Sequence, residues 1–471
     1  MATQIHFGTS GWRAVMAEEF TFSNVRRAVT GIARYVVSQK TSGARVIVGR
    51  DPRFLGETFC AVASEILIAH GITPLLIAEA APTPAISYAV IQEKADGAIN
   101  FTASHNPPEY NGIKFSTPDG APALPEVTKR IEAEIAASDA ANNTPKSQTK
   151  SATAQTLEPR SAYLARLREI VDLKAIQRAN MRVVFDPFWG AARGYSDALL
   201  RDAGVDVSTV HDCRDVLFGG HAPEPDDHLL EGCRERMRAT KANIGIATDG
   251  DADRFGIVDA DGTFFTPNYI VALLFDYLVE SRGWKNGVAK SVATTNLINA
   301  VAKHHGVELY ETPVGFKYIG QLILQDAIAL GGEESAGLTI RGHVPEKDGI
   351  LACLLVAEML AARGASIKEQ VAALFKKLGR EFWPVRENMH LSDEQKANAV
   401  KRVTIDASEL LGRKIVSVDR TDGAKFVFEG GSWMLLRLSG TEPLLRLYVE
   451  AETLDATTKL TREAKNWVLQ G

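Results

Sequence analysis

The sequence has only four cysteines among 471 residues, and their placement excludes two kinds of site. No two of them form a Cys-x-x-Cys pair, and none has a histidine at zinc-finger spacing. Cys353 lies in the apolar run 350–356, so we expect it to be buried. Few and scattered cysteines favour a reducing compartment, and we expect the protein to act in the cytoplasm.

Long apolar stretches and an excess of one charge are also missing. The longest apolar stretches are interrupted by Asp276 and Glu358, well short of a membrane span. Residues 1–10 have neither the basic nor the apolar part of a signal peptide. Lys and Arg total 53 against 58 Asp and Glu, a net charge of -5 with both signs interspersed. We therefore expect no membrane and no nucleic acid as partner, whereas a local basic pocket for a small anion is compatible with this balance.

What the sequence does have is a strand–helix–strand pattern that occurs three times. In each copy the helix closes with a glycine suited to left-handed backbone: Gly71, Gly204 and Gly306. The three copies run from 45–51 to 69–78, from 181–187 to 202–210, and from 290–296 to 304–312. Strands joined in this way are parallel with a right-handed crossover, so three α/β domains of similar make are predicted.

The C-terminal part follows a different pattern. Strand-like segments are joined by Asp422-Gly423 and Gly430-Gly431, which are typical of tight turns, and a polar helix with lysines closes the chain. This predicts a smaller and mostly antiparallel α+β domain. A polar stretch, 137–158, predicts a mobile surface segment between the first and second domains.

The fold class predicted from these patterns is α/β, with three similar domains and one smaller α+β domain. A chain of 471 residues exceeds what one hydrophobic core usually serves. The predicted boundaries are 1–155, 156–263, 264–378 and 379–471.

Residues 102–107, Thr-Ala-Ser-His-Asn-Pro, form a predicted loop after the strand 98–101. Ser, His and Asn compete with the backbone for hydrogen bonds inside a helix, and proline removes a donor. The hydroxyl of Ser104 beside the imidazole of His105 suits a site of chemistry. An ordinary turn has the same composition, so both interpretations stay open.

A second loop, 249–254, carries three alternating aspartates: Asp249, Asp251 and Asp253. In an extended backbone the three carboxylates point to one side, where they repel one another unless a cation such as Mg²⁺ neutralises them. A calcium-binding EF-hand is excluded, because its sixth and twelfth positions are Arg254 and Ala260 instead of Gly and Glu. An acidic surface turn is the alternative.

A third loop, Gly-Gly-Glu-Glu-Ser-Ala-Gly at 331–337, has glycines that allow a ligand to approach the backbone. Glu333 and Ser335 suit hydrogen bonds to hydroxyl groups, as a sugar requires, and a solvated acidic turn is the alternative. The sequence is not a Walker A motif, because no Gly-Lys-Ser/Thr follows.

A fourth loop, 437–443, has the composition of a small anion site. Its hydroxyls and open backbone N–H groups suit phosphate, as do the forked donors of two arginines. The candidate residues are Arg437, Ser439, Gly440, Thr441 and Arg446. A hairpin turn with two surface arginines is the alternative.

Two further cations lie near glycine-rich or loop segments. Arg13 follows Gly8, Ser10 and Gly11, and Lys114 comes soon after residues 102–107. Each is an ordinary surface charge if it stands alone. Taken together, however, the four loops supply a hydroxyl, a cation site, a hydroxyl-binding loop and a phosphate site. This combination predicts phosphoryl transfer to or from a polyhydroxylated ligand.

The chain resembles the α-D-phosphohexomutase family along nearly its whole length. The matching stretches occur in the family's order and are FGTSGWRA, VGRDPR, TASHNPPEYNGIKF, DGDADR, TPVGFK, GEESAG, GHVPEKDG and RLSGTEPLLR. The resemblance implies mixed sheets in three similar α/β domains, which with the C-terminal domain surround a central cleft. It also implies that the four domains carry, in order, the phosphoserine, the metal, the sugar and the phosphate.

The resemblance assigns roles to individual residues. Ser104 matches the phosphorylated serine, and Arg13, His105 and Lys114 match residues around the transferring phosphoryl group. The implied Mg²⁺ ligands, for one ion per chain, are Ser104, Asp249, Asp251 and Asp253. The implied substrate contacts are Arg254, Thr312, Gly315, Glu333, Ser335, His343 and Lys347. Arg437, Ser439, Gly440, Thr441 and Arg446 match the site of the phosphate that is not transferred.

The implied reaction interconverts hexose 1-phosphate and hexose 6-phosphate through a 1,6-bisphosphate, which also serves as activator. The GEESAG loop resembles the glucose type, although Ala336 departs from the commonest residues there, and the Gln typical of glucosamine enzymes is absent. Glucose phosphate is therefore the favoured substrate, with a mannose or dual glucose/mannose mutase as the alternative. A metal-dependent sugar phosphatase and a non-catalytic sugar-phosphate sensor are more remote alternatives.

Overall fold

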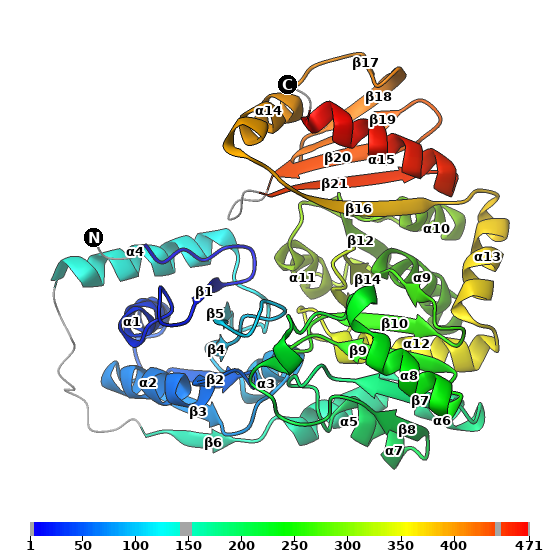
Figure 1. Ribbon diagram of the computed structural model, residues 1–471. Helices are drawn as coiled ribbons and strands as arrows, with labels where there is room; N and C mark the ends of the chain where they lie inside the picture. Colours follow the sequence, from blue (N-terminus) through cyan, green and yellow to red (C-terminus); the bar gives the residue numbers. More distant parts are fainter. Residues whose placement is uncertain (1–3, 142–152, 439–443, 470–471) are drawn as a thin grey trace. The chain divides into compact units, whose positions relative to one another are not determined.

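The structure is a computed structural model that describes residues 4–141, 153–438 and 444–469 (Figure 1). The first of its two compact units comprises Met1–Pro267, Gly315–Gly331 and Ser335–Ile367, and the second comprises Asn268–Val314, Gly332–Glu334 and Lys368–Gly471. Its four sheets comprise three with α/β connections and one antiparallel C-terminal sheet, so the predicted fold class is confirmed.

The first sheet has six strands in the order β1-β5-β4-β2-β3-β6, parallel from β4 to β6 and antiparallel at β5 and β1. Its strands are β1 (Trp12–Val15), β2 (Arg45–Arg50), β3 (Thr73–Ile77), β4 (Ala98–Phe101), β5 (Tyr110–Ser116) and β6 (Gln155–Leu157). Its helices are α1 (Phe22–Gln39), α2 (Gly56–Ala69), α3 (Thr83–Glu93) and α4 (Pro125–Ala141). Ser104 follows β4, so this sheet positions the predicted nucleophile.

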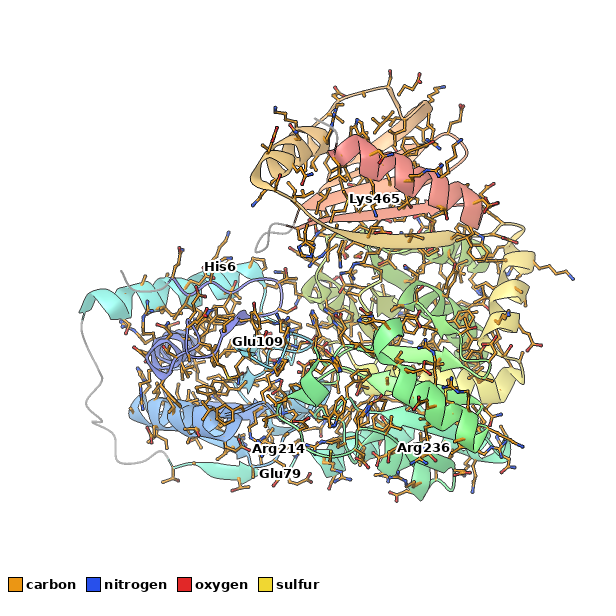
Figure 2. The ribbon with its side chains drawn as sticks, in the orientation of Figure 1. His6, Glu79, Glu109, Arg214, Arg236 and Lys465 are labelled. Atoms are coloured by element: carbon orange, nitrogen blue, oxygen red, sulfur yellow. The ribbon has the colours of Figure 1, made fainter. Side chains whose placement is uncertain are left out.

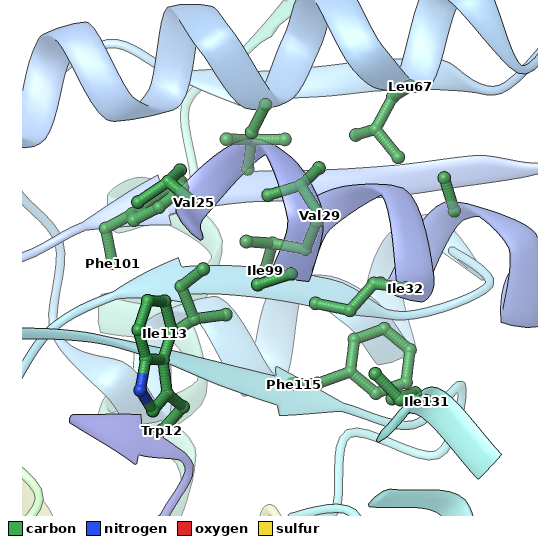
Figure 3. Close-up of a cluster of buried hydrophobic side chains, with 14 of the residues drawn as sticks. Trp12, Val25, Val29, Ile32, Leu67, Ile99, Phe101, Ile113, Phe115 and Ile131 are labelled. Atoms are coloured by element: carbon green, nitrogen blue, oxygen red, sulfur yellow. The ribbon is translucent and has the colours of Figure 1, made fainter. Parts of the chain in front are cut away.

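A hydrophobic core fixes the helices on this sheet. Val25, Val29 and Ile32 recur at helical spacing along α1 and are fully buried. Figure 3 shows them among side chains from β4 and β5, such as Ile99 and Ile113. The strand end that carries Ser104 therefore stands on a rigid support.

The segment 137–158 differs from the prediction. Helix α4 extends to Ala141, and β6 pairs in parallel with β3, placing Leu157 opposite Ile77. The prediction of a mobile surface segment is therefore wrong at both ends, while residues 142–152 lie outside the described residues. Composition alone missed β6, because its hydrogen-bond partner lies far away in the sequence.

The second sheet has the order β11-β10-β9-β7-β8, with β8, β7 and β9 parallel and β10 and β11 antiparallel. Its strands are β7 (Arg182–Asp186), β8 (Asp206–Thr209), β9 (Ile244–Thr248), β10 (Phe255–Asp259) and β11 (Phe264–Phe265). The helices of this region are α5 (Arg160–Ile170), α6 (Leu173–Arg178), α7 (Ser196–Asp202) and α8 (Glu231–Thr240), with short 3₁₀ turns at Phe218–Gly220 and Asp227–Leu229. The aspartate loop joins β9 to β10.

The third sheet has the strand order β13-β12-β14-β15. Its strands are β12 (Gly287–Ser291), β13 (Leu309–Thr312), β14 (Ile328–Gly332) and β15 (Leu338–Ile340). The helices of this region are α9 (Pro267–Arg282), α10 (Leu297–His305), α11 (Phe316–Leu324), α12 (Gly349–Arg363) and α13 (Ile367–Leu378). The strand predicted at 290–296 instead begins at Gly287 and ends at Ser291, so only its first two residues are correct.

The C-terminal sheet is antiparallel throughout, in the order β16-β21-β20-β19-β18-β17. Its strands are β16 (Trp383–His390), β17 (Glu409–Leu410), β18 (Arg413–Asp419), β19 (Ala424–Phe428), β20 (Trp433–Leu438) and β21 (Leu444–Ala451). Its helices are α14 (Asp393–Val403) and α15 (Leu454–Leu469). The predicted turns join β18 to β19 and β19 to β20, and Gly423, Gly430 and Gly431 all have positive φ.

A buried lysine connects β19 to β13 in the second unit. The Nζ atom of Lys425 lies 3.3 Å from Glu311 Oε1 and 4.5 Å from the centre of the Trp433 ring. Burial and then the neighbouring ammonium of Lys290 lower the pKa of Lys425 to about 8, although Glu311 and Glu450 oppose this shift. Lys425 thus costs the folded state stability whenever it is charged.

We predict an unusual pH dependence from Lys425→Met. The pKa of Lys425 is lower when folded than when unfolded, so between these values the unfolded chain binds more protons and stability rises with pH. Relative to the variant, the native chain should gain up to about 3 kcal/mol between pH 7 and pH 10. Urea unfolding at several pH values measures this difference, and a constant difference would contradict the prediction.

Among the described residues, no single helix has the length and apolar character needed to cross a membrane, and only α12 and α13 taken together pass that test. Residues 349–360 of α12 are all buried. Polar residues such as His6, Glu109 and Arg236, labelled in Figure 2, are exposed.

Candidate active site

Ser104 occupies a constrained position just beyond the end of β4. It is 1% exposed and has a φ of 52°, a left-handed conformation that is uncommon for residues other than glycine. Its N–H donates to Thr102 Oγ1 at 2.8 Å, and Thr102 Oγ1 donates to Asp51 Oδ2 at 2.6 Å. The surrounding bonds therefore fix the direction of the serine hydroxyl.

The aspartate loop meets this serine. Ser104 Oγ donates to Asp249 Oδ2 at 2.7 Å, although 145 residues separate them in the sequence. Asp249, Asp251 and Asp253 are all buried and offer carboxylate oxygens within 4.8 Å of one another. The structure therefore brings together the four residues predicted to hold a cation.

A turn of the backbone forms this cluster. Residues 250–253 are not extended, and Ala252 has a φ of 62°, so the condition under which alternating aspartates would share one side of a strand is not met. Alternation in an extended strand is not what gathers the carboxylates. The turn folds back on itself, and the Asp249 N–H donates to the carbonyl of Arg254 at 3.3 Å.

Two lysines neutralise part of this negative charge. Lys114 Nζ donates to Asp251 Oδ2 at 2.6 Å and to Asp253 Oδ2 at 2.7 Å. Lys347 Nζ lies 3.0 Å from Asp253 Oδ2. Lys114 is thus a buried member of the site, and its alternative interpretation as a surface charge is wrong.

The charge balance of the cluster suits a divalent cation. Burial, reinforced by Asp251 and Asp253, raises the pKa of Asp249 well above its usual range. Burial also favours a higher pKa for Asp253, but Lys114, Lys347 and Arg254 outweigh it and hold that pKa well below the usual range. The raised pKa of Asp249 thus reflects burial and the repulsion among three carboxylates that lie close together, and an oxygen-binding cation relieves that repulsion.

The unpartnered oxygens of the cluster point to the same conclusion. Within the described part of the chain, Asp251 Oδ1 and Asp253 Oδ1 are buried without any hydrogen-bond partner. Buried carboxylate oxygens normally have partners, so these atoms are available as ligands. The residues present therefore fit Mg²⁺.

The other predicted residues of the phosphoryl site surround Ser104. His105 Nδ1 lies 3.4 Å from Ser104 Oγ, and Arg13 donates to Asn106 Oδ1 at 2.9 Å. Burial, followed by Arg254 and Arg13, lowers the pKa of His105 well below its usual range, so its imidazole is neutral at pH 7. The Arg254 guanidinium pairs with Glu224 at 2.5 Å, and the Arg254 backbone N–H donates to Asp249 Oδ1.

A cavity of the first unit opens beside these residues. Its lining includes Ser10, Lys114, Glu346, Lys347 and Lys317. The sequence predictions include Lys114 and Lys347 but miss Lys317, although it ends the matching stretch TPVGFK. Burial lowers the pKa of Lys317, as expected for an ammonium group half removed from water.

His343 has a different environment from the lysines. Its side chain is buried and pairs through Nε2 with Asp348 Oδ2 at 2.7 Å. Asp348 also caps α12 through Leu351 N–H and accepts a bond from Tyr163. The structure thus gives His343 a structural partner, and its predicted contact with substrate stays a prediction.

The sequence predicts that the loop 331–337 uses its glycines for close approach of a ligand, and the structure shows another role for two of them. Gly331 and Gly332 belong to β14, and an added Cβ on them would meet Ile319 at 2.2 Å and Val271 at 2.7 Å respectively. The two glycines therefore admit neighbouring side chains instead of a ligand. Ser335 and Gly315 belong to the first unit, and Glu333 to the second.

Besides Glu333, the structure describes three predicted binding residues in the second unit. Thr312 ends β13, with its hydroxyl 3.0 Å from the carbonyl of Pro313. Arg437 on β20 and Arg446 on β21 are cross-strand partners, which brings two guanidinium groups to one end of the sheet. The predicted Ser439, Gly440 and Thr441 lie outside the described residues.

Comparison with known families accounts for nearly the whole chain. Four domain families match, described as phosphoglucomutase/phosphomannomutase alpha/beta/alpha domains I, II and III and the C-terminal domain. They cover residues 4–142, 161–262, 266–378 and 384–466 respectively. The chain belongs to the phosphoglucomutase/phosphomannomutase family. It is therefore a phosphohexomutase, an isomerase that transfers a phosphoryl group.

The relatives of this phosphohexomutase carry different substrate names. A phosphoglucomutase/phosphomannomutase of Thermococcus kodakarensis is 31% identical, over 97% of this chain and 98% of its own. A probable phosphoglucosamine mutase of Methanopyrus kandleri is 30% identical, over 97% and 96%. A crystal structure from Thermus thermophilus, described as a candidate phosphomannomutase, has 33% identity and a TM-score of 0.84, covering 99% of this chain and 100% of that one.

A more distant structure shows ligands in the same fold. The N-acetylphosphoglucosamine mutase of Aspergillus fumigatus, in complex with GlcNAc-6P and magnesium, has a TM-score of 0.57 at 16% identity, covering 99% of this chain and 96% of that one. At this identity the likeness shows the fold alone.

Arg53 lies in the matching stretch VGRDPR, and its place in the phosphohexomutase site is visible only in the structure. Its side chain is completely buried and lies 3.1 Å from Asp51 Oδ2. The remaining guanidinium nitrogens donate to four carbonyl oxygens of the serine loop, those of Ser104, Asn106, Pro107 and Tyr110, at 2.5 to 2.9 Å. Arg53 thus holds the backbone of the nucleophile loop from behind.

We predict that Arg53→Lys lowers kcat at least tenfold and stability by about 2 kcal/mol. A single ammonium keeps the charge opposite Asp51 but has too few donors for four carbonyls. Arg50→Lys is the matched control, because Arg50 is also buried and bonds the carbonyl of Ala78 outside the serine loop. Turnover and urea unfolding measure both variants, and an equal loss of kcat in the control would show a general effect of stability.

Proposed function

We propose that this phosphohexomutase interconverts hexose 1-phosphate and hexose 6-phosphate, with glucose phosphate favoured, and carries the phosphoryl group on Ser104. The observation that supports this most directly is the 2.7 Å bond between Ser104 Oγ and Asp249 Oδ2 within a cluster of three aspartates. A hydroxyl at a candidate cation site is placed to carry phosphate.

In the first half of the proposed reaction, a hydroxyl oxygen of the sugar monophosphate attacks the phosphorus held on Ser104. The phosphorus–Oγ bond breaks, the new phosphorus–oxygen bond forms, the hydroxyl proton passes to a basic group of the site, and that proton then passes to the released Oγ. His105, with its neutral imidazole 3.4 Å from Oγ, is one candidate for that group. The product is a 1,6-bisphosphate sugar.

In the second half, the bisphosphate turns round and returns its other phosphoryl group to Ser104 Oγ by the reverse steps. Mg²⁺ bound by Asp249, Asp251 and Asp253 would offset negative charge on the transferring group. Lys114 and Lys347 hold those aspartates and add positive charge beside them. Arg437 and Arg446 are the candidate anchors for the phosphate that stays on the sugar.

The preference for glucose rests on the likeness of residues 332–337 to the glucose-type sugar loop. A mannose or dual glucose/mannose mutase is the second candidate, because a relative at 31% identity carries both names and the Thermus structure carries the mannose name. Glucosamine phosphate follows, since another relative carries that name.

The test is a side-by-side assay of glucose 1-phosphate, mannose 1-phosphate and glucosamine 1-phosphate, with Mg²⁺ and a trace of bisphosphate activator. We expect isomerised 6-phosphate from all that react, with the highest kcat/KM for glucose. A higher value for another sugar would overturn the glucose preference. Free phosphate in place of an isomer would indicate a phosphatase and overturn the mutase reaction.

A further inference from the structure

Asp422, in the turn between β18 and β19, bonds two candidate binding segments with one oxygen atom. Its Oδ2 accepts a hydrogen bond from Arg437 Nε at 2.8 Å and another from the Val314 N–H at 3.1 Å. Val314 lies between Thr312 and Gly315, both predicted substrate contacts. Asp422, in a pair that the sequence predicted only as a hairpin turn, thus joins the candidate phosphate anchor Arg437 to the candidate substrate-binding segment 312–315.

The neighbouring glycine lets this turn lie against the strand that carries the arginine. Gly423 has a φ of 96°, and a Cβ added to it would lie 2.3 Å from the Leu436 carbonyl oxygen and 3.2 Å from the Arg437 Cα atom. Any side chain there would push the turn away from β20. The Asp-Gly pair therefore serves the contact with Arg437 as well as the reversal of the chain.

The geometry of the guanidinium group gives this contact a consequence. The group is planar, so a bond that fixes Nε also fixes the plane in which the two terminal NH₂ groups lie. Those NH₂ groups form the fork that binds phosphate with two parallel bonds. Asp422 occupies only the Nε side of Arg437.

We propose that Asp422 is a positioning residue that holds the fork of Arg437 ready for the non-transferred phosphate and ties it to residues 312–314. This inference rests on the proposed function, in which Arg437 anchors that phosphate. Asp422 itself need not touch the substrate.

The negative charge of Asp422 also repels phosphate, whereas its bond to Arg437 favours phosphate binding. The two effects predict opposite changes in phosphate affinity when Asp422 is replaced. If repulsion dominated, removing the carboxylate would tighten binding. If orientation dominates, removal weakens binding. About a quarter of the Asp422 side chain is exposed, so water and salt screen its repulsion, whereas the direct bond to Nε is not screened in this way.

The experiment compares Asp422→Ala and Asp422→Asn with the native enzyme under the assay conditions above. We expect Asp422→Ala to raise KM for the preferred hexose 1-phosphate about tenfold and to leave kcat within about twofold, because a mispositioned anchor weakens binding without changing the transferring group. Asp422→Asn keeps an acceptor oxygen for Arg437. Its KM should therefore rise about threefold at most, which is half of the tenfold effect on a logarithmic scale.

Two further variants make the result decisive. Asp419→Ala removes a nearby carboxylate that bonds only Thr421 among the described residues, and it should leave KM unchanged. Arg437→Ala should raise KM at least as much as Asp422→Ala does. If Arg437→Ala leaves KM unchanged, the proposed anchoring role of Arg437 fails, and the role of Asp422 fails with it.

If Arg437→Ala raises KM while Asp422→Ala leaves it unchanged or lowers it, the positioning role alone is overturned. An equal loss of kcat and stability in Asp422→Ala with no recovery in Asp422→Asn would also overturn it, because that pattern is one of damaged folding.

Discussion

Ser104→Ala should abolish turnover, with kcat lower by a factor on the order of 10⁴ or more. The variant removes the only atom that the proposed reaction uses to carry the phosphoryl group between sugar molecules. Alanine still accepts the left-handed backbone at residue 104 at modest cost, and the Thr102 and Arg53 bonds involve only the main chain of this residue. The fold should therefore survive.

The measurement combines the isomerase assay with mass spectrometry of the intact protein after incubation with a hexose 1,6-bisphosphate. The native chain should gain one phosphoryl group, and Ser104→Ala should gain none. Ser87→Ala is a suitable control, because Ser87 is also buried and bonds only the Gly120 carbonyl among the described residues. If Ser104→Ala kept more than a tenth of the activity, another residue would carry the phosphate. A sugar-phosphate sensor would bind ligand in both forms without any turnover.

Much of the fold follows from short-range patterns. Gly71, Gly204 and Gly306 predict three helix ends, and all three have positive φ in the structure. The strand after each glycine is parallel to the strand before the helix. These predictions succeed because helix ends and crossover units are decided by residues close together in the chain.

The failures concern features that depend on distant partners. Strand β6 is stabilised by its pairing with β3, so the polar composition of 137–158 gave no sign of it. The start of β12 at Gly287 likewise depends on pairing with β13. A sequence pattern describes what a segment can form, but the partner decides where a strand begins.

The same distinction applies to the site. Residue types predicted Ser104 and the three aspartates, yet the turn at Ala252 and the bonds of Lys114 depend on the packing of two sheets. Arg53 did carry a signal, since an arginine two residues after an aspartate at the end of an apolar strand is costly to bury without many partners. Its four carbonyl acceptors are spread over seven residues of another loop and are visible only in the structure.

Removal of divalent cations should lower turnover by a factor on the order of 10³ while leaving the fold intact. The activity falls because the transferring phosphoryl group loses its strongest positive neighbour. The fold persists because Lys114 already bonds Asp251 and Asp253, and Lys347 bonds Asp253, so removing the cation does not leave the carboxylates without positive partners. We expect the melting temperature to fall by only about one degree, which corresponds to about 1 kcal/mol in a protein of 471 residues.

Lys114→Met tests whether Lys114 and the bound cation can each neutralise the aspartates of this cluster in the absence of the other. Without Lys114 the native state depends on a bound cation to neutralise Asp251 and Asp253, so chelation should now lower the melting temperature much more than in the native chain. The Arg254 backbone N–H still donates to Asp249 and Lys347 still pairs with Asp253, which keeps the metal-loaded variant folded. Chelation followed by thermal unfolding and by return of Mg²⁺ measures both effects. Equal shifts in the native chain and the variant would show that Lys114 does not substitute for the cation, and full activity after chelation would remove the cation from the mechanism.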